Sequence, residues 1–147
     1  MVYIKSKKEI EQMRVPAEIM KEVLSEIKKN VREGVTTSYL DYVAESVMIK
    51  HGAVPSFRGV ECPYPGGKTY THATCISVNE DIIHGIPDSR PLKKGDVVSV
   101  DVGVYKGRIP CRCRKNVYSW WRLTASQKAN TSYRTSLFCR SRSSCGR

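Results

Sequence analysis

The sequence predicts an α+β fold over residues 1–106 and a tail over residues 107–147 that does not belong to that fold. Apolar residues recur at helical spacing up to about residue 50, and after Gly52 the spacing changes to the alternation of β-strands. Helices followed by strands are typical of the α+β class. The composition changes at residue 107: residues 1–106 hold 15 Lys and Arg against 14 Asp and Glu, whereas residues 107–147 hold ten basic residues and no acidic one.

Two amphipathic helices are expected at the start of the chain. Residues 6–9, Ser-Lys-Lys-Glu, have the form of a capping box, and the apolar spacing that follows predicts a helix over about 7–30. Residues 36–38, Thr-Thr-Ser, offer the N-cap of a second helix, which ends near His51-Gly52. The apolar faces of both helices are assigned to core packing and to no chemical role.

Short strands are expected after Gly52. Candidates are Ser56–Val60, Cys75–Val78 and Ile82-Ile83, with a turn-rich loop around residues 63–67. The clearest strand is Val97–Tyr105. Alternation places Val98, Val100, Val102 and Val104 on one face of this strand, and Val97, Ser99, Asp101 and Gly103 on the other.

Three residues of the strand region have side chains with a possible chemical role. Asp101 lies inside a valine-rich strand, where it is either exposed, in a local salt bridge, or a ligand of a divalent metal such as Mn²⁺, Fe²⁺, Zn²⁺, Co²⁺ or Mg²⁺. His84 stands before Gly85 and Pro87 and is either an ordinary histidine or a donor to a substrate carbonyl. Cys75 is either a small buried apolar residue or the lining of a pocket for a thioether.

Composition narrows the class of protein. The chain has no apolar run long enough for a membrane span and no secretory signal at its N-terminus, so we expect a cytoplasmic protein without a membrane partner. In the cytoplasm the six cysteines are expected to be reduced thiols or metal ligands. The net charge of +11 invites a nucleic-acid partner, but ten of these charges lie in the tail.

Several motifs over residues 3–106 together resemble the type I methionine aminopeptidases of metallopeptidase family M24. The opening helix at Ser6–Arg14 and the Gly34–Thr37 connection followed by Leu40-Asp41 resemble that family. The more specific matches are Cys75–Glu80 with His84–Pro87, and the strand that ends in Asp101-Val102-Gly103; Pro55-Ser56-Phe57 also matches.

The resemblance implies the N-terminal half of a pita-bread fold, in which two α/β halves enclose a site for two divalent metal ions (Co, Mn, Fe, Zn or Mg). It implies removal of the initiator methionine from nascent polypeptides by a metal-activated water, near the ribosome and by a monomer. Asp101 matches one of five metal ligands, His84 matches a catalytic histidine that contacts the substrate, and Cys75 and Tyr70 match residues that line the methionine pocket.

The resemblance ends after Lys106. The family continues with a strand whose last aspartate is the second metal ligand, and at that position this chain has Arg112. Reading the codons one nucleotide later from Gly107 onward allows Asp-Gly-Tyr-His-Ala-Asp, with an aspartate at position 112. Trp120-Trp121 must then become glycine, because TGG is the only tryptophan codon. We therefore predict that residues 107–147 are an out-of-frame translation with no native structure.

Two alternatives stay open at this point. The tail can be a basic arm that binds RNA or the ribosome through arginine and aromatic side chains, or that holds zinc through Cys111, Cys113, Cys139 and Cys145. The chain can also be a binding module with a pita-bread fold and no catalytic activity.

Overall fold

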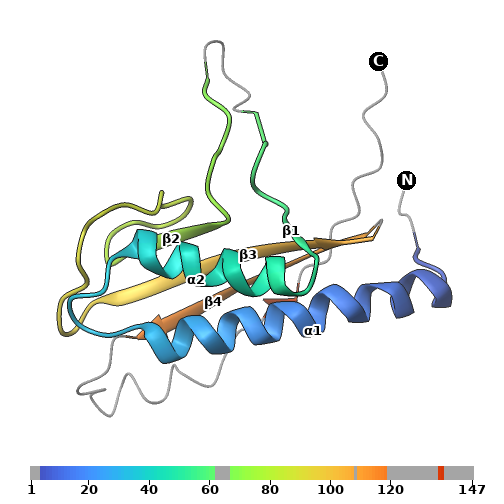
Figure 1. Ribbon diagram of the computed structural model, residues 1–147, viewed down its shortest axis with the longest axis horizontal. Helices are drawn as coiled ribbons and strands as arrows, with labels where there is room; N and C mark the ends of the chain where they lie inside the picture. The colour runs from blue at the N-terminus through green and yellow to red at the C-terminus, as the bar shows by residue number, and fades with distance from the viewer. Residues whose placement is uncertain (1–3, 62–66, 108, 119–135, 138–147) are drawn as a thin grey trace.

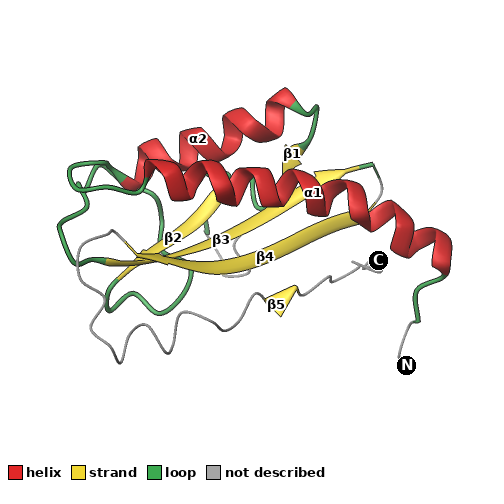
Figure 2. Ribbon diagram, turned by 90° about the horizontal axis from the view of Figure 1, so that it is seen from below, coloured by secondary structure: helices red, strands yellow, loops and turns green. Residues whose placement is uncertain are grey.

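The computed structural model describes residues 4–61, 67–107, 109–118 and 136–137, and only the backbone in the last two segments. Two helices lie side by side on one face of an antiparallel sheet, so the described part of the chain has the predicted α+β architecture (Figures 1 and 2). No helix in this part of the chain is long and apolar enough to cross a membrane.

Helix α1 spans Lys7–Asn30, as the capping box and the apolar spacing predicted. The Glu9 amide donates to Ser6 Oγ at 3.3 Å, and Glu9 Oε2 accepts from the Ser6 amide at 2.8 Å. These two bonds satisfy backbone donors that the first turn of a helix leaves unpaired. The buried face of α1 begins in its middle, where Pro16 is followed by Ile19, Met20, Val23, Leu24 and Ile27.

Helix α2 spans Thr37–Lys50 and is also close to its predicted bounds. Thr36 caps its N-terminus by accepting from the Tyr39 amide at 3.2 Å. At the other end, Lys106 Nζ donates to the carbonyl oxygens of His51 at 2.8 Å and Gly52 at 3.0 Å. A cation at a helix C-terminus is favourable because the helix dipole is negative there. The contact also joins Lys106, at the end of the longest predicted strand, to α2.

The sheet is built around β3, Val97–Lys106, which pairs with β1, Val54–Pro55, and β2, Thr74–Val78, along one edge and with β4, Ile109–Tyr118, along the other. A two-residue strand β5, Ser136–Leu137, pairs with β4. Two predicted strands were wrong: residues 56–60 form bends and turns after β1, and Ile82-Ile83 lie in an irregular loop.

The predicted division of β3 into two faces is confirmed. Val98, Val100, Val102 and Val104 are each 0% exposed and belong to one apolar cluster with the buried faces of α1 and α2. Because alternate residues of a strand point to opposite faces, Asp101 and Gly103 lie on the face away from this core.

The structure differs from the sequence expectation just beyond Lys106. Residues 109–118 were expected to have no native structure, yet β4 pairs with β3 over its whole length, from Lys106↔Ile109 to Val97↔Tyr118. Strand pairing uses backbone groups, which every residue of β4 except Pro110 supplies in full, and it covers an edge of β3 that would otherwise be bare. The proposed tail ligands Cys139 and Cys145 and the Trp120-Trp121 pair lie outside the described residues, as do the side chains of Cys111 and Cys113.

Candidate functional site

Asp101 is a buried carboxylate in the middle of the sheet. The residue is 4% exposed, and it pairs with Cys75 on β2 and with Arg114 on β4. The alternative that Asp101 lies on a solvent-exposed strand face is therefore wrong. A buried carboxylate is costly unless hydrogen bonds, opposite charge or a cation stabilise it, so the salt-bridge and metal-ligand alternatives for Asp101 both stay open.

Tyr70 and Cys75 lie close to Asp101. Burial raises the pKa of the Tyr70 hydroxyl far above its ordinary value, and hydrogen bonding to Cys75 and the negative charges of Cys75, Asp41 and Asp101 raise it further. The Tyr70 hydroxyl donates to the Thr74 carbonyl at 2.7 Å, and Cys75 is 8% exposed. Three of the four residues that the sequence singled out are thus brought together at one end of β2.

His84 lies along the edge of β2 that does not pair with β3. Its backbone is in the left-handed region, with φ of 59°, and the residue is exposed and lines an open depression together with the rest of residues 80–86, 88 and 90. The next residue, Gly85, accepts from the Ile76 amide at 2.9 Å and donates to Ser77 Oγ at 3.1 Å. A Cβ at Gly85 would lie 2.2 Å from the Ile76 carbonyl oxygen, so only glycine allows this approach.

A second glycine, Gly103, allows the Pro55-Ser56-Phe57 motif to pack against the strand with Asp101. Gly103 accepts a hydrogen bond from the Ser56 amide at 2.9 Å, and a Cβ at Gly103 would lie 1.9 Å from Ser56 Oγ and 2.9 Å from the Phe57 ring. The Pro-Ser-Phe segment therefore packs directly on the strand that carries Asp101. This contact fixes the loop after β1 on the face of the sheet that holds the candidate site.

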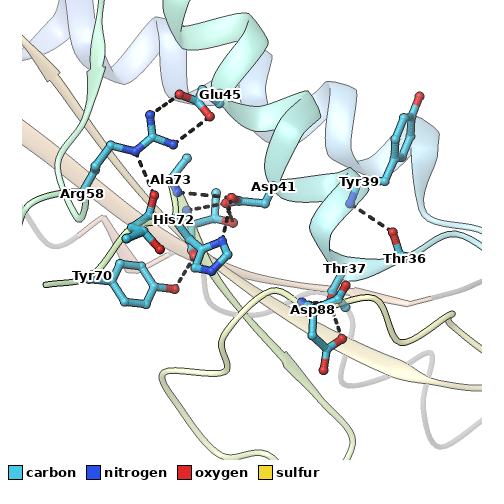
Figure 3. A network of polar contacts seen from close by, with 12 residues as sticks. Thr36, Thr37, Tyr39, Asp41, Glu45, Arg58, Tyr70, His72, Ala73 and Asp88 are labelled. Carbon is cyan, nitrogen blue, oxygen red and sulfur yellow. Dashed lines mark hydrogen bonds and ion pairs between the residues drawn. The ribbon is translucent and has the colours of Figure 1, made fainter. Parts of the chain in front are cut away.

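One residue of the site was missed by the chemical reading of the sequence. Asp41 of α2 is 6% exposed and accepts hydrogen bonds from the backbone and side chain of Thr74, both at 2.7 Å (Figure 3). Its sequence signal was its position on the buried face of α2, among Thr37, Leu40, Ala44 and Met48. A carboxylate in an apolar helical stripe needs a buried partner, and that pattern is readable without a structure.

The described residues do not supply the donors of a two-metal site. In the part of the chain that the structure describes, no group of three or more His, Cys, Asp and Glu side chains is placed to hold a metal ion. Asp101 supplies one carboxylate. The register puts residue 112 opposite Gly103, two positions along β4 from the partner of Asp101, and residue 112 is an arginine, which cannot ligate a metal.

Residues 11–119 match the model of metallopeptidase family M24. The chain belongs to this family. The matched range includes α1 from residue 11 onward, all of α2 and the strands β1 to β4, so it covers Tyr70, Cys75, His84 and Asp101.

Several relatives that resemble the chain in sequence are methionine aminopeptidases. The methionine aminopeptidase of Clostridium perfringens is 44% identical over 104 residues, which are 71% of this chain and 39% of that protein. Methionine aminopeptidase 1 of Bacillus subtilis is 41% identical over 103 residues, again 39% of its length. The chain thus spans about two fifths of these relatives.

Solved structures of methionine aminopeptidases have the same fold over about half of their length. The methionine aminopeptidases of Rickettsia prowazekii and Thermotoga maritima superpose with a TM-score of 0.77 at 26% and 29% identity, over 90% of this chain and 50% of theirs. The prolidase from Pyrococcus furiosus shares the fold alone, with a TM-score of 0.66 at 17% identity. The chain is therefore an α+β half of the pita-bread fold, as the resemblance implied.

Proposed function

We propose that this chain is the N-terminal part of a methionine aminopeptidase, a cytoplasmic, monomeric enzyme that removes the initiator methionine from nascent polypeptides near the ribosome. The observation that supports this most strongly is the cluster of Tyr70, Cys75 and Asp101 at the β2–β3 pair. A polarisable thiol and an aromatic ring suit the thioether of methionine, and a buried carboxylate suits a divalent cation.

Each site residue has a separate role in this proposal. Tyr70 and Cys75 line the pocket for the methionine side chain, and His84 is the catalytic residue that contacts the substrate from the edge of β2. Asp101 is the one metal ligand that residues 1–106 contribute to a pair of divalent ions, whose identity among Co, Mn, Fe, Zn and Mg is open. Such a metal pair would supply Lewis-acid chemistry at the peptide carbonyl, and Asp101 is the one residue of 1–106 that would hold it.

The 147-residue chain by itself is expected to be inactive, because a single carboxylate cannot organise two metal ions. Purified chain is incubated with a Met-Ala-Ser peptide and Mn²⁺ or Co²⁺, and free methionine is measured. The methionine aminopeptidase 1 of Bacillus subtilis serves as the positive control. Methionine release by the chain above the level of its Asp101→Ala variant contradicts the inference of inactivity.

We also propose that residues 107–147 arise from one extra nucleotide near the codons for Lys106 and Gly107. The net charge of +10 in residues 107–147 and the arginine at position 112 support this proposal. Sequencing the gene across these codons tests it. Removing one nucleotide should open a frame that encodes aspartate at position 112, and the protein made from it should release methionine from the same peptide. An early stop codon in that frame, or a protein without activity, would overturn the proposal.

The basic tail supports a second candidate function, binding of RNA or the ribosome. Ten basic residues without one acidic residue would give RNA binding that weakens steeply with salt. Binding of a labelled ribosomal RNA fragment is compared between the full chain and a chain that ends at residue 106. Equal binding by the two chains excludes a role of the tail.

A further inference from the structure

The strongest unassigned feature of the described chain is the acceptor site made by Asp41. Its Oδ1 accepts from the Thr74 amide and the Thr74 hydroxyl, both at 2.7 Å, and its Oδ2 lies 3.3 Å from the Ala73 amide and 3.3 Å from His72 Nδ1 (Figure 3). One buried side chain on α2 therefore holds three consecutive residues that lead into β2.

These three residues are directly connected to the proposed methionine pocket. Thr74 precedes Cys75 in the chain, and its carbonyl accepts the hydrogen bond of the Tyr70 hydroxyl at 2.7 Å. The ring of His72 stands edge-on to the ring of Tyr70, with centroids 5.6 Å apart. Thr74 therefore links both pocket residues, and Asp41 fixes Thr74 by its backbone and by its side chain.

A neighbouring contact offers a comparison one helical turn further along α2. Glu45 forms a two-pronged ion pair with Arg58, whose Nε donates to the Thr71 carbonyl at 2.9 Å (Figure 3). This pair ties α2 to the same loop, but the Arg58 side chain is 43% exposed and its hydrogen bond to the loop goes to residue 71, before the segment that Asp41 holds. Exposed ion pairs contribute little, whereas a buried carboxylate that accepts from backbone amides determines where those amides lie.

We propose that Asp41 is a positioning residue that sets the wall of the methionine pocket by holding Thr74, and through it Tyr70 and Cys75, in place. This inference rests on the proposed function for the identity of the pocket, but the positioning itself can be measured without activity. Substitution of Asp41 should release the segment before β2 while the helices and β3 stay folded, because the valine face of β3 packs on α1 and α2 independently of this contact.

Alkylation of Cys75 by N-ethylmaleimide under native conditions tests the proposal. Trypsin releases residues 69–93, in which Cys75 is the single cysteine, so mass spectrometry reads this thiol separately from the other five. We expect Asp41→Ala to speed Cys75 labelling by about tenfold or more, because local opening exposes the thiol without global unfolding. Asp41→Asn should give an intermediate rate, since its amide oxygen still accepts from Thr74 while its NH₂ group faces the Ala73 donor.

Two controls separate positioning from general destabilisation. Glu45→Ala removes the neighbouring contact of α2 to the loop and should leave the labelling rate unchanged. Met48→Ala weakens the core and should speed labelling only as far as its urea midpoint falls. The proposal is overturned if Asp41→Asn labels as slowly as the parent chain, or if Asp41→Ala labels no faster than a Met48→Ala chain of equal stability. If Asp41→Ala does not fold, Asp41→Asn and Thr74→Val, which removes one donor, decide the outcome.

The two proposals fail separately. Fast labelling of the Asp41 variants combined with no methionine release by the frame-corrected protein leaves the positioning intact and refutes the proposed function. Methionine release combined with unchanged labelling refutes the positioning alone.

Discussion

Gly85 offers a sharp test of how the loop with His84 is held. In Gly85→Ala the new Cβ would lie 2.2 Å from the Ile76 carbonyl oxygen and 2.7 Å from the Ser77 Cα, and neither backbone atom can move without distorting β2. The loop must therefore leave the strand edge. It then loses the Ile76 amide bond to the Gly85 carbonyl and the Gly85 amide bond to Ser77 Oγ.

The expected cost follows from these contacts. Each hydrogen bond contributes about 1 kcal/mol net, and overpacking adds about 1–3 kcal/mol unless the loop detaches to relieve it. Detachment limits the total, so we expect the free energy of unfolding to fall by about 2–3 kcal/mol. Ser77→Ala is the matched control, since it removes the acceptor of the Gly85 amide and adds no atom, and it should cost about 1 kcal/mol.

Urea unfolding followed by circular dichroism gives the two free energies, and hydrogen exchange at the Ile76 amide reports whether the loop has left the strand. The Ile76 amide should lose protection in Gly85→Ala and keep it in Ser77→Ala. If Gly85→Ala is no less stable than Ser77→Ala and its Ile76 amide stays protected, the close approach of Gly85 to β2 is not what holds the loop.

Three further predictions concern stability. Ser6→Ala removes the capping box of α1 and should lower the free energy of unfolding by about 1 kcal/mol, measured by urea unfolding. If Glu9→Ala lowers this free energy and Ser6→Ala does not, the Ser6 hydroxyl is not needed for the cap. Met48→Ala deletes a side chain that is 0% exposed and should cost about 2–5 kcal/mol in the same assay, with an unchanged midpoint contradicting the core assignment. The pKa of Glu45 is lowered by its hydrogen bond to Arg58, and the pKa of Asp88 by the Arg90 amide. A lowered folded-state pKa adds stability above the unfolded value of about 4, so stability should hold from pH 7 to about 5 and fall below about 4. Thermal melts across this range in Glu45→Gln should show a weaker acid dependence, and an identical dependence would mean that this pair is not responsible.

The regular elements were predictable because their signals are local. The capping box at residues 6–9 and the apolar spacing located α1 within a residue, and strict alternation separated the valine face of β3 from the face with Asp101. The short strands were less predictable. Residues 56–60 were predicted as a strand, but the Val60 amide turns back to the Phe57 carbonyl and Gly59 has a φ of 82°, so the strand is limited to Val54–Pro55.

Candidate site residues were identified from the sequence, but their grouping was not. Cys75 and Asp101 are separated by 26 positions and become neighbours only because β2 and β3 pair in the register that joins them. Asp41 was noted in a motif without a role, because its partners lie more than 30 residues away, in the segment before β2. Side-chain partners between elements depend on packing that no local pattern records.

The sequence by itself determined the family resemblance, the two helices, the valine face of β3 and the break in composition at residue 107, since each is a pattern of neighbouring residues. Only the tertiary structure decided that Asp101 is buried, that Asp41 holds Thr74, and that Gly85 lies against the backbone of β2. It also showed that residues 109–118 pair with β3 although their composition is foreign to the fold. Backbone pairing tolerates almost any side chain, whereas a metal site requires particular donors, so the strand can form where the arginine at position 112 cannot serve as a ligand.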